Sequence, residues 1–140
     1  MYILDASVFA PLVVMTGKRF LEIAQKHRFI ILDLTVYETC NVFWKEYRKF
    51  HRLSVEDVLE LCSVIKLLAN KLNVYGFEDL DFKKVVDIAV NNNITVYDSA
   101  YIALALELHT PVASEDKDIL NVGPRYNVVV MKLNELLERL

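Results

Sequence analysis

Residues 94–108 read ITVYDSAYIALALEL and combine two patterns in one short stretch. The β-branched run from Ile94 to Val96 is typical of a short strand, and the residues from Val96 to about Leu108 predict a very apolar helix. Asp98 lies at the junction between the two. A strand that leads directly into a helix is the repeating unit of α/β folds with a mainly parallel sheet.

The same alternation extends over the whole chain. Strand patterns are predicted at residues 2–4, 29–32, 74–77, 111–113 and 128–131. Helical patterns are predicted at residues 7–14, 17–27, 36–50, 54–72, 81–91, 96–108 and 133–140. No repeat, linker or low-complexity segment interrupts them. Residues 1–140 are therefore expected to form one α/β domain with a central, mainly parallel sheet flanked by helices.

Four acidic residues come shortly after these predicted strands. Asp5, Glu38, Asp98 and Asp116 each lie near a junction between a strand and a helix. In an open α/β sheet, ligands bind in the crevice outside the carboxyl ends of the strands. Four carboxylates gathered in such a crevice would repel one another unless a cation neutralised them. The pattern therefore predicts a metal site.

Helix capping is the alternative for two of these acids. Thr35 and Thr95 each precede an acid by three residues, which is the spacing of a capping box with threonine at the N-cap. A carboxylate in the first helical turn is also favoured by the helix dipole. Taken singly, Glu38 and Asp98 fit either interpretation. Asp5 and Asp116 show no such sequence pattern, and the four acids together favour a shared site.

Other common site chemistries find little support in the chain. Three glycines and no glycine-rich motif exclude the usual phosphate-binding loops. The three histidines are scattered, which disfavours zinc, and no nucleophile elbow is present. A site lined only by oxygen ligands selects Mg²⁺ or Mn²⁺. Two such ions about 3.5–4 Å apart hydrolyse phosphodiester bonds without a general base from the protein.

Four segments together resemble the PIN domain, and most closely the single-domain toxin ribonucleases of the VapC type. They are YILDAS at residues 2–7, TVYE at residues 35–38 with Asn41, TVYDSAYIALA at residues 95–105, and SEDKD at residues 114–118. The segments span the whole chain in the order and spacing of that family, and the third is the most specific. One departure is Ser114, where the family often has threonine; the hydroxyl is kept.

The resemblance implies a Mg²⁺- or Mn²⁺-dependent endoribonuclease that acts as the toxin of a toxin–antitoxin pair. Its metal-binding and catalytic residues would be Asp5, Glu38, Asp98 and Asp116. Its partners would be the RNA substrate and a cognate, VapB-like antitoxin. The alternatives left open are a PIN nuclease in RNA processing, one acting on structured DNA, and an inactive interaction module. Phosphotransfer folds are disfavoured because the chain lacks a second acid close to Asp5.

Several further residues are candidates for supporting roles. Ser7 is expected to bond a metal-bound water or to cap the next turn, and Asn41 follows Glu38 by one helical turn on the same face. Ser114 joins them as a second supporting hydroxyl. For Asp118, a solvated position and a role at the site both remain open.

The only basic cluster comprises four residues, with Tyr47 and Phe50 interleaved. These residues are Lys45, Arg48, Lys49 and Arg52. They are candidates for RNA binding, with the aromatic rings stacking on bases. An equally open interpretation is that the cations complement a helix C-terminus.

The composition of the chain leads to expectations about its oligomeric state and its cellular location. The hydrophobic fraction of 54% exceeds the usual range, which indicates a homodimer or a bound partner, with a dense core as the alternative. The apolar stripes of residues 36–50 and 54–72 are either core or a groove for an antitoxin segment. A net charge of −3 gives no general attraction for polyanions. Two cysteines without a disulfide pattern, no signal peptide and no membrane-spanning stretch lead us to expect a cytoplasmic protein.

Overall fold

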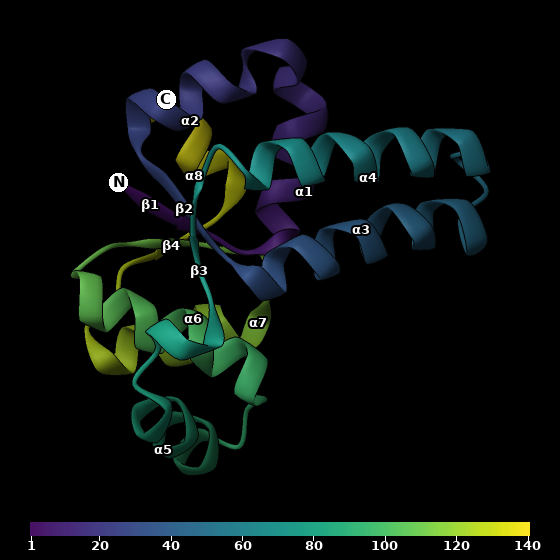
Figure 1. Cartoon of the computed structure of the whole chain (residues 1–140). Helices are drawn as coiled ribbons and strands as arrows, with labels where there is room; N and C mark the ends of the chain where they lie inside the picture. Colours follow the sequence, from purple (N-terminus) through teal and green to yellow (C-terminus); the bar gives the residue numbers. More distant parts are fainter.

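The structure, a computed structural model, describes residues 1–140 and has a five-stranded parallel sheet at its centre (Figure 1). The strands are β1 (Tyr2–Leu4), β2 (Phe29–Leu32), β3 (Asn73–Tyr75), β4 (Val112–Ala113) and β5 (Val130–Met131). Their order across the sheet is β3-β2-β1-β4-β5, and every pair is parallel. The predicted fold class is confirmed.

The order of the strands reverses at β1. The chain moves outward from β1 to β2 and β3 on one side, and then to β4 and β5 on the other. Ile3 of β1 is in register with Ile30 on one flank and Val112 on the other. Such a reversal opens a crevice beyond the carboxyl ends of the central strands. The segments that follow β1 and β4 meet there.

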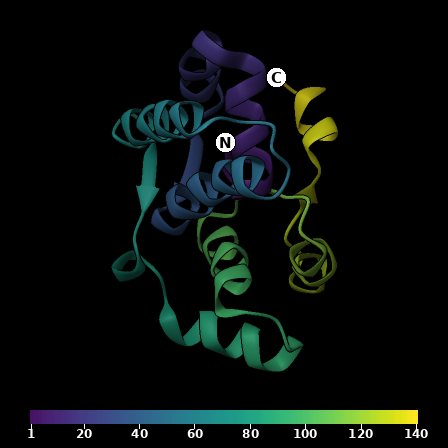
Figure 2. The same ribbon diagram turned by 90° about the vertical axis from the view of Figure 1, so that its right-hand side faces the viewer.

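Helices cover both faces of the sheet (Figures 1 and 2). They are α1 (Ala6–Thr16), α2 (Phe20–His27), α3 (Asp33–Arg48), α4 (Val55–Ala69), α5 (Phe82–Asn92), α6 (Val96–Leu108), α7 (Lys117–Val122) and α8 (Leu133–Leu137). Short 3₁₀ helices are η1 (Gly17–Arg19), η2 (Phe77–Asp79) and η3 (Gly123–Tyr126). None of the helices combines the length and apolarity needed to cross a membrane.

Alternation along the strands divides the core into two clusters. Ile3 packs with the α5–α7 side, whereas the next residue, Leu4, packs with the α1–α4 side. Ile30 and Ile31 of β2 divide in the same way. Successive strand residues point to opposite faces, so a strand buried on both faces is apolar throughout. Helices α3 and α4 lie side by side and project beyond the sheet as a hairpin (Figure 1).

Two sequence predictions about local structure are wrong. Ile94 and Thr95 form no strand; they are a short connection after Asn93, which ends α5 in the left-handed conformation at φ 52°. Thr35 is not an N-cap, because α3 begins at Asp33 rather than Val36. The Thr35 hydroxyl instead accepts a hydrogen bond from the Leu32 amide at 3.1 Å, from within the first turn.

Smaller differences concern the ends of elements. Helix α1 extends to Thr16 rather than ending at residue 14, with Pro11 inside it. The extended residues predicted at 74–77 end at Tyr75, and Phe77 opens η2. The final helix stops at Leu137 instead of Leu140. These shifts do not change the order of the predicted elements, but helix α7 (Lys117–Val122) was not predicted.

Candidate active site

The four acids predicted to share a site line one pocket of about 370 Å³ at the crevice. Each lies in or directly before a different helix: Asp5 precedes α1, Glu38 lies in α3, Asp98 lies in the first turn of α6, and Asp116 precedes α7. The pocket is lined by Asp5, Ala6, Ser7, Glu38, Asn41, Val42, Lys45, Asp98, Tyr101, Glu115 and Asp116. The structure therefore brings together carboxylates that are far apart in the chain.

Asp5 is the most enclosed of the four, with a relative exposure of 5%. One carboxylate oxygen accepts the Ser7 amide, and the other accepts the hydroxyls of Ser7, at 3.0 Å, and Ser114. Burial raises the pKa of Asp5, the hydrogen bonds from Ser114 and Ser7 oppose that effect, and the charge of Asp116 adds to it. An anion buried among donors but close to another anion favours a nearby cation.

Two serine hydroxyls tie the loop after β4 to the start of α1. Ser114 donates to Asp5 and accepts the Asp116 amide at 2.9 Å. Ser7 likewise donates to Asp5 and accepts the Glu115 amide at 2.8 Å. Both hydroxyls thus fix the position of Asp5 relative to Asp116. These bonds do not show the expected capping of the next turn by Ser7; its hydroxyl joins Asp5 to the Glu115 amide instead.

Glu38 is held by a relay of buried hydroxyls. The Tyr101 hydroxyl donates to its Oε2 at 3.1 Å and lies 2.8 Å from the Thr35 hydroxyl. Because Thr35 accepts the Leu32 amide, the relay runs from the end of β2 to the carboxylate. Burial raises the pKa of Glu38, and the charges of the other acids act in the same direction. Burial and Glu38 also raise the pKa of Tyr101, so its phenol stays protonated.

Asp98 and Asp116 approach each other from two helix N-termini. Thr95 is the N-cap of α6, as predicted; its hydroxyl accepts the Asp98 amide at 3.1 Å and donates to the Asp98 carboxylate at 2.9 Å. One oxygen each of Asp98, Asp116 and Asp118 lie within 4.8 Å of one another. Burial, together with the charges of Asp116, Asp118 and Asp5, raises the pKa of Asp98.

Asp5 and Asp116, which have no capping-box pattern in the sequence, are themselves N-caps. Asp5 caps α1, and Asp116 caps α7 by accepting the Asp118 amide at 2.8 Å and the Ile119 amide at 3.4 Å. Both of these bonds use Oδ1 of Asp116, so neither of them occupies Oδ2. Capping and participation in a shared site are therefore compatible in one carboxylate.

The basic cluster is only partly at the pocket. Lys45 lines it, as does Asn41 one turn after Glu38. Arg48 ends α3 and Lys49 caps it, beyond the pocket lining. Arg52 pairs with Glu46 at 3.4 Å and lies over the Phe50 ring, 5.0 Å from its centroid.

Two polar residues that line the pocket were not predicted from the sequence, Tyr101 and Glu115. Tyr101 follows Asp98 by three residues, so its place on the same face of α6 was a usable signal. Glu115 had no such signal, because its position depends on its hydrogen bond from the Leu133 amide, at 2.9 Å.

The oxygen atoms that line the pocket are suitable ligands for hard divalent cations. The set consists of carboxylates, with hydroxyl and amide oxygens next to them, and includes no sulfur or imidazole. Such oxygen ligands are those of Mg²⁺ and Mn²⁺. Burial raises the pKa of Asp5, Glu38 and Asp98, and repulsion from neighbouring acids adds to the rise. A cation among them would relieve this repulsion.

A family model described as "PIN domain" matches residues 2–123. The chain belongs to the PIN domain family. Among curated PIN proteins it is 29% identical over 119 residues to "Exonuclease VapC9" of Pyrobaculum aerophilum, covering 85% of this chain and 83% of the relative. It is 26% identical over 125 residues to "Ribonuclease VapC3" of the same organism, covering 87% of this chain and 94% of the relative. The resemblance inferred from the sequence is confirmed.

The chain also resembles a solved structure over almost its entire length. The crystal structure of PAE2754 from Pyrobaculum aerophilum matches with a TM-score of 0.75 at 26% identity, covering 99% of this chain and 87% of that one. The described fold is therefore that of a known structure along its full length.

Proposed function

We propose that this PIN domain is a metal-dependent endoribonuclease that hydrolyses RNA phosphodiester bonds. The observation that carries the proposal is the convergence of Asp5, Glu38, Asp98 and Asp116 in one pocket at the switch point of the sheet. The names of the two curated relatives, a ribonuclease and an exonuclease, support nucleic acid as the substrate.

The four acids would hold Mg²⁺ or Mn²⁺. Asp118 could join them, because one of its oxygens lies within 4.8 Å of oxygens of Asp98 and Asp116. When bound, such ions supply an activated water and neutralise the charge of the phosphate. The protein's own residues then have separate tasks. Ser7 and Ser114 hold Asp5 in place, and Tyr101 holds Glu38. Lys45, at the rim of the pocket, is placed to bind a phosphate oxygen.

The decisive test is cleavage of a circular single-stranded RNA, which has no ends for an exonuclease. We expect cleavage with Mg²⁺ or Mn²⁺ and none with excess EDTA. Glu38→Gln should abolish cleavage, whereas Glu22→Gln, an exposed acid on α2, should leave it unchanged. Cleavage of linear RNA alone would replace the endonuclease by an exonuclease. Undiminished cleavage in EDTA would contradict the metal site.

A toxin role with a VapB-like antitoxin is the second part of the proposal. An apolar groove of about 450 Å³ lies between α1 and the α3–α4 hairpin. It is lined by Ser7, Ala10, Pro11, Val14, Val42, Phe43, Glu46, Arg52, Leu53 and Leu61. Because Ser7 and Val42 also line the acidic pocket, a segment bound in this groove would reach the site.

Expression in a bacterial host tests the toxin role. We expect growth arrest from the native chain, none from Glu38→Gln, and rescue by co-expression of the product of a short neighbouring reading frame. Cleavage in vitro without any growth arrest would favour the alternative, RNA processing or action on structured DNA.

We place the activity in the cytoplasm, because the two cysteines, Cys40 and Cys62, are both free.

We also propose a homodimer, because many large apolar side chains are exposed in the single chain. Light scattering over the micromolar range should give twice the mass of one chain. A monomer throughout that range would contradict it.

A further inference from the structure

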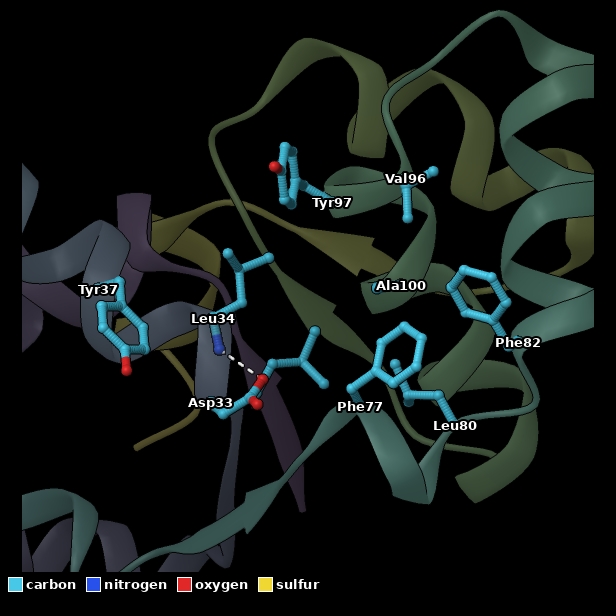
Figure 3. A pocket seen from close by; sticks show the side chains of 10 residues that line it. Asp33, Leu34, Tyr37, Phe77, Leu80, Phe82, Val96, Tyr97 and Ala100 are labelled. Carbon is cyan, nitrogen blue, oxygen red and sulfur yellow. Dashed lines mark hydrogen bonds between the residues drawn. The ribbon is translucent and has the colours of Figure 1, made fainter.

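A second cleft, of about 380 Å³, lies next to the acidic pocket and has the opposite character (Figure 3). Its lining consists of Leu32, Asp33, Leu34, Tyr37, Phe77, Leu80, Phe82, Val96, Tyr97 and Ala100. Asp33 is the only charged residue among them. Figure 3 shows the rings of Tyr37, Tyr97, Phe77 and Phe82 arranged around Leu34 and Ala100.

The aromatic rings of this cleft are unusually open to solvent. Tyr37 is 78% exposed, Tyr97 60% and Phe77 59%. Phe77 and Phe82 pack on each other with ring centroids 4.6 Å apart, which forms one wall. Single exposed apolar residues are ordinary, but several gathered in one concave surface mark a binding site. The volume lies within the range of small-ligand pockets.

The cleft and the acidic pocket share their two boundary helices. Tyr37 is the chain neighbour of Glu38 on α3, and Tyr97 is the neighbour of Asp98 on α6. Successive helical residues point about 100° apart, so each helix presents a ring to the cleft and a carboxylate to the pocket. A group in the aromatic cleft therefore lies directly beside the acids.

Helix α3 arranges three surfaces in sequence. Its first turns line the aromatic cleft. Glu38, Asn41 and Lys45 of the following turns line the acidic pocket, and Arg48 comes one turn later at the end of the helix. A single strand of RNA can follow this order, because each phosphate joins two riboses that carry flat, apolar-faced bases, and further phosphates follow along the strand.

We propose that the aromatic cleft binds an unpaired nucleobase adjacent to the phosphate that is cleaved. The inference rests on the proposed ribonuclease function and names its substrate class: single-stranded RNA. Bases in a duplex are already stacked and cannot enter a cleft, whereas unpaired bases stack on aromatic side chains. Phosphates on the other side of the cleaved bond would lie along Lys45 and Arg48.

Abasic substitution tests the proposal directly. A short single-stranded RNA is labelled, and one base at a time is replaced by an abasic ribose. Binding is measured by fluorescence anisotropy with Ca²⁺ in place of Mg²⁺, with the RNA shown to be intact afterwards. We expect one position, next to the mapped cleavage site, at which loss of the base weakens binding about tenfold.

Protein variants combined with the RNA that is abasic at this position form a double-mutant cycle. Tyr37→Ala should weaken binding of the intact RNA about tenfold, but should add almost nothing for the RNA that is abasic at this position. Tyr37→Phe should bind as the native protein does. Val90→Ala, which removes an equally exposed apolar side chain from α5, is the control and should change nothing.

Three results are distinguishable from the expected one. If Tyr37→Ala and Tyr97→Ala bind and cleave RNA normally, the nucleobase site is refuted. If either variant turns a dimer into a monomer without changing RNA binding, the cleft is an interface with a second copy, and the proposal is overturned. If the native protein neither binds nor cleaves RNA, the proposed function itself fails.

Discussion

At the scale of single residues, the acidic pocket shows that a carboxylate can cap a helix and serve a shared site. Asp5 and Asp116 are both N-caps, and Asp98 bonds its own N-cap threonine. A capping role and a metal-binding role nevertheless predict different consequences when the charge of one acid is removed.

Replacing Asp98 by asparagine separates these roles. If Asp98 acts at a metal site, removal of its charge relieves repulsion with Asp116, Asp118 and Asp5, so the melting temperature in EDTA should hold or rise. The stabilisation by Mg²⁺ and RNA cleavage should both fall sharply. Thermal melting with and without Mg²⁺ and a cleavage assay measure all three. Normal cleavage with a lowered melting temperature in EDTA would leave Asp98 with a capping role alone.

Tyr101→Phe removes one hydroxyl from the relay that holds Glu38. The free energy of unfolding should fall by about 1–3 kcal/mol, because the buried Thr35 hydroxyl and Glu38 each lose a partner. Affinity for Mn²⁺ should also fall, since Glu38 is no longer held. Urea unfolding and calorimetric titration measure the two effects. Tyr126→Phe is the matched control: its hydroxyl accepts a bond from Asn92, away from the pocket, so Mn²⁺ affinity should not change.

At the scale of elements, the site is assembled from helix N-termini at one edge of the sheet. Helices α1, α6 and α7 each begin with a side-chain cap, at Asp5, Thr95 and Asp116. The positive ends of these helix dipoles all face the pocket, which favours carboxylates there. Local capping and the position of the acids are therefore linked.

Thr95→Ala tests this link at α6. Loss of the cap should lower the free energy of unfolding by about 1 kcal/mol. It also removes the hydroxyl that orients Asp98, so cleavage should fall, while Thr95→Ser should retain both properties. Thr16→Ala, at the last residue of α1, is the control and should leave cleavage intact. Unaltered cleavage by Thr95→Ala would show that Asp98 needs no such support.

At the scale of the whole molecule, we expect the cluster of acids to make the stability of the protein depend on pH and on divalent cations. Burial raises the pKa of Asp5, Glu38 and Asp98 in the folded state. An acid whose pKa is raised on folding stabilises the fold at pH values below its unfolded pKa, near 4 for such acids. That contribution is lost as pH rises through the raised folded-state value.

In EDTA, the contribution of these three acids to the free energy of unfolding should therefore decrease as pH rises above about 4. Mg²⁺ should restore stability at neutral pH by neutralising the carboxylates. Melting curves from pH 4 to pH 8, with and without Mg²⁺, measure both effects. A Mg²⁺ effect that is equal at pH 4 and at pH 8 would argue against binding by these acids.

Much of the architecture followed from the sequence because it depends on local patterns. Apolar strands such as Phe29–Leu32, helical periodicity, and the helix stop at Asn93 are set by neighbouring residues. The position of each acid after a strand or at a helix start, combined with the rule that parallel strands end at one edge, was enough to predict that the four acids converge.

Tertiary structure alone decided the contacts that join distant segments. Ser114 meets Asp5 across 109 positions, and Tyr101 meets Glu38 across 63, because neighbouring strands and facing helices bring them together. Ile94 and Thr95 have the composition of a strand but form none, since a strand needs a partner and the chain there only links α5 to α6. Thr35 and Thr95 share a local motif, yet burial against Tyr101 gives Thr35 a different role.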